Sequence, residues 1–291
     1  MNVLLPGSLA ELWPLLARTD VAVMAGGTDL LVRCRSGKAV EEICCLERLS
    51  ELHGVAQENE TLRIGAATPL TELLEDARIR DRLPALHQAL RQLGSPLIRN
   101  QASLGGNLCT ASPAGDSLPA LLALDAELEL ASALETRVLP VGAFLLGPGR
   151  TAVRPGEVVT AVHLRFPESG TLQHFEKVGK RRSLAIAVAS LAACLRLEDG
   201  LVRSARLALG SVAPTVFRCR EAEARLEGRP LNRANLEATA ILVRQAVRPI
   251  SDVRATAEYR RLVAGNLVLR LACLIPGPTS DTTAPVCAPR P

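Results

Sequence analysis

The sequence predicts an α+β protein in two parts, on the basis of three observations. The chain has 291 residues, enough for one large domain or two of ordinary size. Residues 1–170 combine short β-branched apolar runs with segments that repeat at helical spacing. Beyond about Gly170, strand-like runs meet at Asp199-Gly200, a dipeptide typical of a type I′ hairpin turn, and helical segments follow. We therefore expect an antiparallel sheet with helices in residues 171–276.

The sequence near the N-terminus predicts a helix followed by a strand. Ser8 followed three residues later by Glu11 is a capping-box pattern, which predicts a helix over "SLAELWPLLAR". The short apolar run Val21–Met24 predicts a buried strand.

Polar residues, proline and glycine mark the next helix ends. Thr28 or Asp29 is expected to cap a helix that starts near Leu30. Thr68-Pro69 predicts an N-cap followed by proline at the first helical position, and Gly94 predicts a C-cap. Strand-like runs lie at 39–46 and 61–68, helical runs at 70–79 and 82–94, and a short helix with a strand after it at 118–132.

The remaining segments include one long polar stretch. Residues 95–117 are rich in glycine, but the regular placing of proline and glycine within them is not typical of a flexible linker. Strands are expected at 174–179 and 185–212, and helices at 218–228, at 232–247 with Asn232 as N-cap, and at 254–275. Residues 277–291 are rich in proline and threonine and predict a mobile tail.

Composition and charge exclude several classes of protein. Hydrophobic residues make up 48% and charged residues 22%, which is typical of a folded domain. The net charge is +4 and the basic residues are scattered, apart from Lys180-Arg181-Arg182, which argues against nucleic acid as a partner. No apolar run reaches the roughly 18 to 20 residues of a membrane span, and no signal-peptide pattern opens the chain. A cytoplasmic protein without a membrane span is expected.

Cysteines and histidines do not form a recognisable metal site. None of the 8 cysteines forms a C-x-x-C pair, and none has a histidine at metal-ligand spacing. We therefore expect the cysteines to be reduced structural thiols, and we expect no metal site on this chain. Aromatic residues make up only 2%, so aliphatic groups and backbone would have to cover a planar cofactor. We assign no catalytic role to any side chain, including His53, His87, His163 and His174.

Two glycine pairs share one design. At Gly26-Gly27 and Gly105-Gly106 the absence of a Cβ lets backbone N–H groups approach a ligand. A helix start nearby adds unpaired N–H donors that suit a phosphate. Two such loops can hold the two phosphates of a dinucleotide, and Thr28, Ser103 and Asn107 can add hydrogen bonds. The alternative is that each pair is only a tight turn, since the chain lacks the Rossmann and P-loop glycine motifs.

The order of several longer segments, and the residues within each, indicate a specific protein family. "AGGTDLL", "IGAATPLTELLED", "IRNQASLGGNL" and "ASPAGDSLPALLALDAELEL" resemble the FAD-binding medium subunit of the molybdenum hydroxylases, the family of bacterial xanthine dehydrogenase and aerobic carbon monoxide dehydrogenase. "FEKVGKRRSLAIAV" and "EYRRLVAGNLVLR" resemble the C-terminal flavoprotein domain of that family. The resemblance spans roughly residues 1–275. It implies an FAD-binding PCMH (vanillyl-alcohol-oxidase-like) domain over 1–170, with subdomains of roughly 1–55 and 56–170, and a carbon monoxide dehydrogenase flavoprotein C-terminal domain over 171–276.

The resemblance also implies which residues hold FAD. Ser103 stands where the second loop usually has threonine, and its hydroxyl can still donate a hydrogen bond. Val159 matches an aliphatic residue whose backbone contacts the cofactor. The pyrophosphate would be held by two loops, formed by Ala25, Gly26, Gly27, Thr28, Asp29 and Leu30 and by Ser103, Leu104, Gly105, Gly106 and Asn107.

Two charged residues complete this implied site. Asp116 matches an aspartate that contacts FAD; the alternative is that Asp116 caps the helix after it, a role that Ser117 could equally take. Lys177 matches a lysine near the flavin, where a cation would stabilise the anionic reduced ring and raise its potential. The alternative for Lys177 is a solvated strand lysine.

One departure from the family pattern concerns the flavin surroundings. Some relatives place a tyrosine or tryptophan against the isoalloxazine in the segment after the lysine. Here that segment reads "RRSLAIA", with Leu184 and Ile186 and no aromatic residue, as in the xanthine-dehydrogenase-like branch. FAD is still expected to bind, and access to flavin N5, and with it the electron acceptor, stays open.

The resemblance implies that the organic substrate binds on another chain. A large subunit with the molybdenum cofactor hydroxylates an N-heterocycle, an aldehyde or CO, and a small subunit passes electrons through [2Fe–2S] clusters. FAD on this chain takes two electrons and delivers a hydride to NAD⁺, or electrons to a quinone or O₂. The implied assembly is a dimer of heterotrimers.

Two other functions stay open. One is a stand-alone flavoprotein oxidase of the same FAD-binding fold, which would need catalytic His, Tyr or Cys groups over the flavin. The other is an assembly or scaffold subunit that has lost FAD, against which both intact glycine loops argue.

Overall fold

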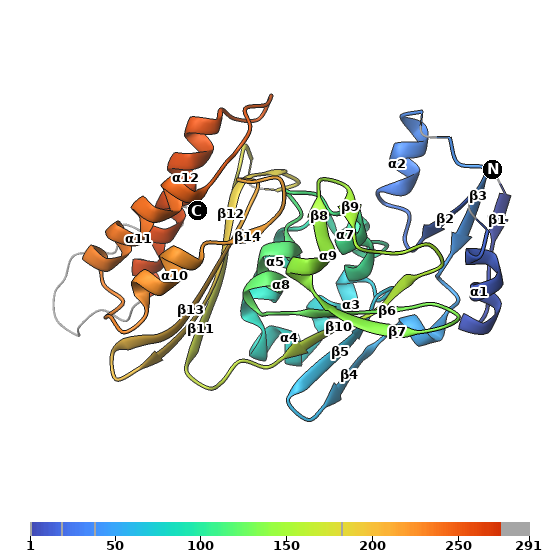
Figure 1. Ribbon diagram of the computed structural model, residues 1–291, viewed down its shortest axis with the longest axis horizontal. Helices are drawn as coiled ribbons and strands as arrows, with labels where there is room; N and C mark the ends of the chain where they lie inside the picture. The colour runs from blue at the N-terminus through green and yellow to red at the C-terminus, as the bar shows by residue number, and fades with distance from the viewer. Residues whose placement is uncertain (1, 19, 38, 182, 275–291) are drawn as a thin grey trace.

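The computed structural model describes residues 2–274, apart from 19, 38 and 182. The fold is α+β, as predicted. Figure 1 shows three layered units along the chain: a small N-terminal sheet, a larger central sheet with many helices, and a third sheet covered by the C-terminal helices. The expected tail at 277–291 lies outside the described residues.

The N-terminal unit is a parallel three-stranded sheet of order β1-β3-β2. Its elements are β1 (Asn2–Leu4), α1 (Leu9–Leu16), β2 (Val21–Met24), α2 (Leu30–Arg35), β3 (Glu42–Cys45) and η1 (Ser50–Leu52). The strand expected at 21–24 is confirmed, but its predicted burial is wrong: β2 is an edge strand, and Val23 is 40% exposed. A small core, which includes Leu12, Cys44 and Leu49, lies beneath this sheet.

The predicted capping box at α1 forms with a shift of one residue. The Glu11 N–H donates to the Ser8 hydroxyl (3.3 Å), and the Glu11 carboxylate accepts from the Gly7 N–H (2.8 Å). The cap predicted at Thr68 is wrong. Thr68 donates its hydroxyl to the Gly54 carbonyl (3.2 Å), and the helix after it starts one residue beyond Pro69.

The central unit is an antiparallel sheet of order β4-β5-β10-β6-β7. Its strands are β4 (Val55–Glu58), β5 (Thr61–Gly65), β6 (Glu127–Ala131), β7 (Thr136–Pro140) and β10 (Val158–Arg165). A small hairpin is formed by β8 (Leu145–Gly147) and β9 (Arg150–Thr151). The helices are α3 (Leu70–Glu75), α4 (Ala77–Arg82), α5 (Pro84–Gln92), α6 (Pro96–Arg99), α7 (Leu104–Thr110), α8 (Ser117–Ala123) and α9 (Val141–Phe144).

The C-terminal unit is an antiparallel sheet of order β11-β12-β13-β14 with helices on one face. Its strands are β11 (Thr171–Gly179), β12 (Ala187–Glu198), β13 (Leu201–Gly210) and β14 (Phe217–Arg218), and its helices are α10 (Arg220–Leu226), α11 (Arg233–Ala246), α12 (Ala257–Arg270) and η2 (Leu271–Leu274). The predicted type I′ turn is confirmed, because Asp199 and Gly200 have φ of 52° and 74°. Asn232 caps α11 as predicted, accepting from the Asn235 N–H (3.0 Å).

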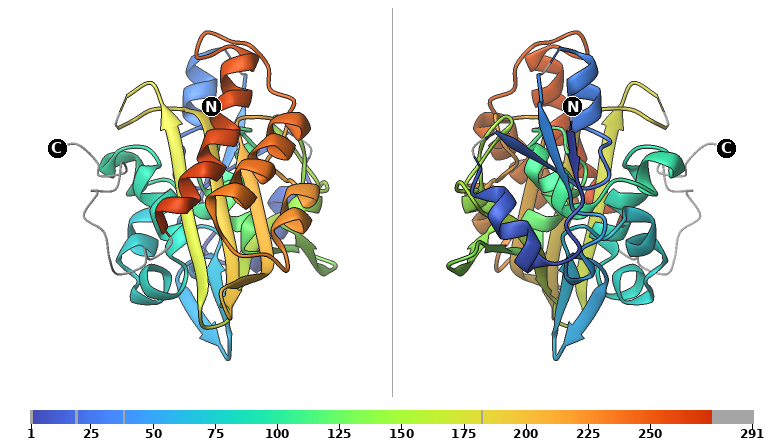
Figure 2. Two further views of the ribbon diagram at one scale, coloured as in Figure 1. Left: turned by 90° about the vertical axis from the view of Figure 1, so that its left-hand side faces the viewer. Right: turned by 90° about the vertical axis from the view of Figure 1, so that its right-hand side faces the viewer.

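The C-terminal sheet is buried on both faces. One face packs against α10–α12, as the left view of Figure 2 shows, in a core that includes Leu191 and Leu207. The other face adds Phe175, Ala192 and Ala208 to the core of the central unit, where α5 and α8 cover it. Burial on both faces explains why β12 reads as an almost continuous apolar run.

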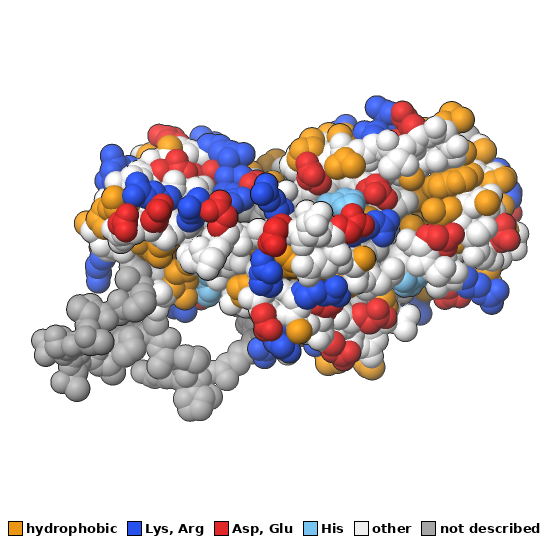
Figure 3. Space-filling model, turned by 90° about the horizontal axis from the view of Figure 1, so that it is seen from below, with side chains coloured by type: hydrophobic (Ala, Val, Ile, Leu, Met, Phe, Trp, Pro, Cys, Tyr) orange, Lys and Arg blue, Asp and Glu red, His pale blue; other side chains and the backbone are white. Residues whose placement is uncertain are grey.

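Charged side chains reinforce this contact between units. Asp125, after α8, pairs with Arg206 (2.6 Å) and Arg218 (2.6 Å). Arg218 also forms a two-armed pair with Glu223 of α10 (2.7 and 2.9 Å), and the side chains of Arg218 and Glu223 are only 8% and 4% exposed. Elsewhere, on the face shown in Figure 3, positive and negative side chains are interspersed.

We expect Arg218→Met to reduce the free energy of unfolding by roughly 3 kcal/mol, because the buried Glu223 carboxylate then keeps only the exposed Arg220 and the Leu207 N–H as partners. Urea unfolding measures this loss. The matched control is Arg233→Met, which breaks the exposed pair with Glu237 (87% and 52% exposed) and is expected to cost less than about 1 kcal/mol. Equal losses in the two variants would contradict the importance of the buried pair.

Candidate functional site

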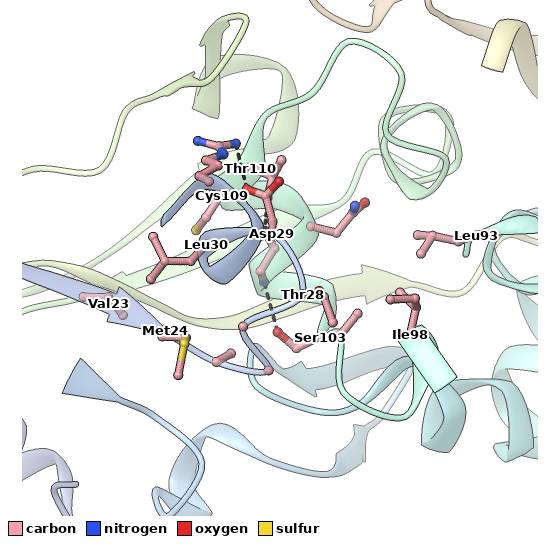
Figure 4. A pocket seen from close by; sticks show the side chains of 17 residues that line it. Val23, Met24, Thr28, Asp29, Leu30, Leu93, Ile98, Ser103, Cys109 and Thr110 are labelled. Carbon is pink, nitrogen blue, oxygen red and sulfur yellow. Dashed lines mark hydrogen bonds and ion pairs between the residues drawn. The ribbon is translucent and has the colours of Figure 1, made fainter. Parts of the chain in front are cut away.

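Two adjoining cavities lie between the N-terminal and central units. The first, of about 340 Å³, separates β2 and the glycine turn after it from α7, and Figure 4 shows side chains of both sides pointing toward it. The second, of about 240 Å³, shares one wall with the first and extends toward β10. Residues common to both are Val23, Ala25, Ser103, Gly106 and Cys109. The two cavities therefore form one groove across the junction.

Most residues of the predicted site line this groove. All of Ala25, Gly26, Gly27, Thr28, Asp29 and Leu30 line the first cavity, with Ser103, Gly106 and Asn107 opposite them. Gly105 and Val159 line the second cavity. Leu104 is fully buried in the core behind α7 and lines neither cavity, and Asp116 and Lys177 also line neither.

The second glycine pair lies in a helix, which corrects its expected form as a loop. Gly105 and Gly106 belong to the first turn of α7, which Ser103 caps by accepting from the Gly106 N–H (3.1 Å). The Gly105 N–H donates to the Ala66 carbonyl (2.9 Å). These two amides are therefore used within the protein. A Cβ at Gly105 would lie 2.6 Å from that of Ala66, so this glycine is required by packing.

The first glycine loop is different, because its amides are free. Among the described residues, the backbone N–H groups of 26–30 donate no hydrogen bond. Gly27 has a φ of +69°, which favours glycine. A Cβ at Gly26 would lie 1.6 Å from the Gln101 carbonyl oxygen, so the loop lies directly against the chain that leads into α7. Successive free N–H groups in such a loop form an anion-binding concavity.

Asp29 connects the two sides of the groove instead of capping α2. It occupies the N-cap position, but its side chain accepts no N–H of the helix, and Thr28 is not the cap either. The Asp29 carboxylate pairs with Arg33 (2.7 Å) and accepts from the Thr110 hydroxyl of α7 (3.3 Å), as the dashed lines in Figure 4 show. The predicted cap is therefore wrong.

Asp116 and Lys177 form a buried ion pair near one end of the groove. Lys177 Nζ lies 2.7 Å from Asp116 Oδ2, and their side chains are 7% and 9% exposed. Burial raises the pKa of Asp116 to about 6, against the opposing effect of the Lys177 charge. Neither alternative for the helix cap forms: Asp116 makes no capping bond, and Ser117 donates its hydroxyl to Asn107 Oδ1 (2.6 Å). Lys177 is not a solvated strand lysine.

The comparisons with known proteins agree with this geometry. Residues 1–167 match the family described as the FAD binding domain in molybdopterin dehydrogenase, and residues 174–273 match the carbon monoxide dehydrogenase flavoprotein C-terminal domain. The putative xanthine dehydrogenase FAD-binding subunit of Escherichia coli K12 is 38% identical over 260 residues, covering 87% of this chain and 88% of that protein. The chain belongs to the family of FAD-binding medium subunits of molybdenum hydroxylases.

Relatives and solved structures of this family extend the match. The nicotinate dehydrogenase FAD-subunit of Eubacterium barkeri is 32% identical over 245 residues, covering 82% of this chain and 83% of that protein. A structure of carbon monoxide dehydrogenase from Hydrogenophaga pseudoflava superposes with a TM-score of 0.89 at 30% identity, covering 93% of this chain and 95% of that one. These matches confirm the predicted family, the FAD cofactor and the oxidoreductase class.

The groove of this FAD-binding subunit has the donors and acceptors that a dinucleotide requires. Free amides at 26–30 suit the pyrophosphate, and the exposed side of β2 provides apolar surface at Val23. Oδ1 of Asp116 is buried without any hydrogen-bond partner, so an acceptor is available beyond the groove wall. The residues present therefore fit FAD.

Other candidate groups lie away from the groove. None of the 4 histidines lines either cavity, and in the described part of the chain no group of His, Cys, Asp or Glu could hold a metal ion. Among the described helices, none could span a membrane. The cysteines described as free are Cys34, Cys44, Cys45, Cys109, Cys194 and Cys219. Cys273 is disulfide-bonded, so the expectation of a reduced thiol is wrong there.

We expect Gly26→Ala to destabilise the fold by roughly 1 to 3 kcal/mol, because its Cβ would overlap the Gln101 backbone. Thermal unfolding of the FAD-free chain measures this effect without any contribution from ligand. Gly7→Ala is the matched control, since its Cβ would only touch the Glu11 carboxylate at 3.6 Å. An unchanged melting temperature for Gly26→Ala would show that the loop can move away from α7.

Proposed function

We propose that this chain is the FAD-carrying electron-transfer subunit of a molybdenum hydroxylase complex. It would receive electrons from the [2Fe–2S] clusters of a partner subunit and deliver them to NAD⁺ or another acceptor. The observation that carries the proposal is the row of unbonded amides at 26–30, which faces α7 across a groove in a chain of this family. Bound FAD supplies the redox chemistry, since it can exchange both single electrons and a hydride.

The two sides of the groove would hold FAD in different ways. The amides of 26–30 would donate to the pyrophosphate, and the Thr28 hydroxyl and the Asn107 side chain can add polar contacts. α7 would present its first turn at Gly106, which is exposed to the groove. Ser103 and Gly105 would act by fixing α7, because their polar groups are already bonded within the protein.

The remaining residues of the predicted site would act at the two ends of the groove. Val159 would provide apolar contact in the second cavity. Asp116 would meet the cofactor near the end bounded by Leu93 and Asn107. In this arrangement residues 1–170 form the FAD-binding domain, in subdomains 1–55 and 56–170, and residues 171–276 form the flavoprotein C-terminal domain.

The proposed partners are a large subunit with the molybdenum cofactor and a small subunit with [2Fe–2S] clusters, in a dimer of heterotrimers. The relatives are named as an FAD-binding subunit, an FAD-subunit and a medium chain. These names support the proposal that other subunits carry the remaining cofactors. The substrate of the complex would be an N-heterocycle, an aldehyde or CO, bound on the large subunit. We place the complex in the cytoplasm.

We expect Gly106→Asp to abolish the yellow colour of the purified chain. A side chain there would enter the groove, because a Cβ meets only the Ser103 hydroxyl at 3.0 Å, and its carboxylate would repel the pyrophosphate. The measurement is the visible spectrum together with the cofactor released on heating. Gly106→Ala adds the Cβ without the charge and should retain most FAD. If both the wild-type chain and its complex with the partner subunits lack FAD, the chain is a scaffold and the proposal fails.

We expect the reduced complex to pass electrons to NAD⁺, a quinone or O₂ only through the FAD of this chain, because the flavin can exchange both single electrons and a hydride. Stopped-flow mixing of the substrate-reduced complex with each acceptor measures the three rates directly from the flavin absorbance. Loading the complex with the FAD-free Gly106→Asp chain is the control, and it should block transfer to all three acceptors while the iron–sulfur centres are still reduced. Transfer that continues without FAD would contradict the electron path proposed for this chain.

A further inference from the structure

One wall of the second cavity is formed by the segment that joins β9 to β10. Residues 152–157 end in a tight turn, in which the Glu157 N–H donates to the Arg154 carbonyl (3.1 Å) and Gly156 has a φ of 79°. Proline in the second position and glycine in the third, as in Arg154-Pro155-Gly156-Glu157, are typical of a type II turn. The lining residues in and beside this segment are Thr151, Val153, Glu157, Val158 and Val159.

Glu157 places a buried carboxylate at this wall. Its side chain is only 4% exposed, and the residue lines the second cavity. Its two oxygens accept from Nε and Nη2 of Arg137 (2.7 Å each), and Oε2 also accepts from the Arg154 N–H (2.8 Å). These hydrogen bonds, above all those from Arg137, lower the pKa of Glu157 against the opposing effect of burial. Glu157 is therefore an ionised and paired group.

Arg137 reaches the wall from β7, an edge strand of the central sheet. Its Nη2 donates to the Ala152 carbonyl (2.7 Å) as well as to Glu157. One guanidinium therefore bonds to both ends of the segment 152–157. Arg137 itself lines neither cavity, so its effect on a ligand must pass through the residues that it holds.

The carboxylates of the groove follow one pattern. Among the described residues, Asp29 lines the first cavity and Glu157 lines the second, and each is paired with an arginine. The pair of Asp29 with Arg33 is exposed (48% and 44%), whereas the Glu157 carboxylate is buried. An unpaired carboxylate would repel a pyrophosphate, and the repulsion is stronger where water is excluded. Neutralisation by an arginine therefore matters most at Glu157.

We propose that Arg137 is a positioning residue that acts on the cofactor through Glu157. Its guanidinium holds the Glu157 carboxylate in the wall and neutralises its charge, so that the second cavity accepts part of an anionic dinucleotide. This inference rests on the proposed function, and it adds a residue that lies outside every cofactor motif of the sequence.

The other charged groups near Glu157 do not replace Arg137. Arg154 acts on Glu157 mainly through its backbone N–H, because its guanidinium forms an exposed pair with Glu135 (2.8 Å). Within the described chain, Arg137 is the one charged side chain that bonds to Glu157. Removal of Arg137 would therefore leave a buried carboxylate with a single backbone donor.

Removal of Arg137 also makes the charge of the cavity depend on pH. The Glu157 carboxylate then loses the cation and the hydrogen bonds that lower its pKa, while burial still raises it. The pKa of Glu157 is therefore higher in Arg137→Met than in the wild type. At high pH the carboxylate of this variant repels the pyrophosphate, and as the pH falls the carboxylate takes up a proton and the repulsion ends.

The experiment measures the FAD affinity of the full-length chain by flavin fluorescence from pH 5.5 to 8.5, for Arg137→Met, Glu157→Gln and the double variant. If the chain retains FAD only with its partner subunits, the complex is used. At the alkaline end we expect Arg137→Met to bind FAD about 10-fold or more weakly than the wild type, as for loss of a hydrogen bond to a charged group.

The double variant should recover most of this loss. Glutamine at 157 is neutral, and its carbonyl oxygen can still accept from the Arg154 N–H. Glu157→Gln alone should weaken FAD binding less than Arg137→Met does, because it leaves no unpaired carboxylate at the wall. Far-UV circular dichroism identifies misfolded variants, and Arg137→Gln, which keeps N–H donors for the Ala152 carbonyl, then replaces Arg137→Met.

The pH profile separates the effect of charge from that of packing. The affinity of the wild type relative to Arg137→Met should fall toward unity as the pH drops, whereas its affinity relative to the double variant should not change with pH. These ratios cancel the contribution of groups that all variants share, such as Asp116 with a pKa of about 6. Arg154→Met is the matched control, because it removes an exposed guanidinium but keeps the N–H that bonds to Glu157, so its profile should equal that of the wild type.

Three results would overturn the inference. A double variant that binds no better than Arg137→Met would mean that Arg137 acts only by packing the segment 152–157. A ratio of wild type to Arg137→Met that stays constant with pH would mean that the charge of Glu157 does not reach the ligand. An equal loss in Arg154→Met would mean that any positive charge nearby has the same effect. Absence of FAD from the wild-type chain and complex would instead remove the proposed function.

Discussion

The close approach of two backbone segments holds the groove together. Gly26 lies so near the Gln101 carbonyl that no side chain fits between them, and Gly105 also lies too close to Ala66 for a side chain. These contacts fix the first loop against the entry to α7 and α7 against the end of β5. The free amides of the first loop therefore face a helix whose position is set by packing. Glycine is needed at these two points for contact within the protein, before any ligand is considered.

The parts of the fold with local signals could be predicted from the sequence. The helix at Ser8, the cap at Asn232 and the turn at Asp199-Gly200 depend on residues close together in the chain, and the structure confirms each. β10 was not predicted, although it is the central strand of its sheet. Its "VVTAVHLR" run is buried on both faces and lacks the alternation that marks a half-buried strand.

The sequence predicted two segments that face each other across the groove, but not how their polar groups are bonded. The sequence motifs located the two facing sides of the groove, at 25–30 and 103–107, because the residues of each side are close together in the chain. They did not locate other lining residues, such as Arg33, Ile98 and Thr110. They did not show that the Gly105 and Gly106 amides are already bonded, since that depends on Ser103 at a helix start and on the distant Ala66 carbonyl. The pairing of Arg137 with Glu157 joins β7 to the segment before β10, which no local pattern relates to it.

The N-terminal unit has the smallest of the three apolar cores, and it forms one whole wall of the groove. Local opening of a protein starts where the fewest apolar contacts are lost, so this wall is the part that separates most easily from the remainder. A dinucleotide that contacts both walls binds only the closed arrangement and so favours it by mass action. Bound FAD would then hold the two walls together, and the subunit would resist unfolding most strongly once FAD has bound.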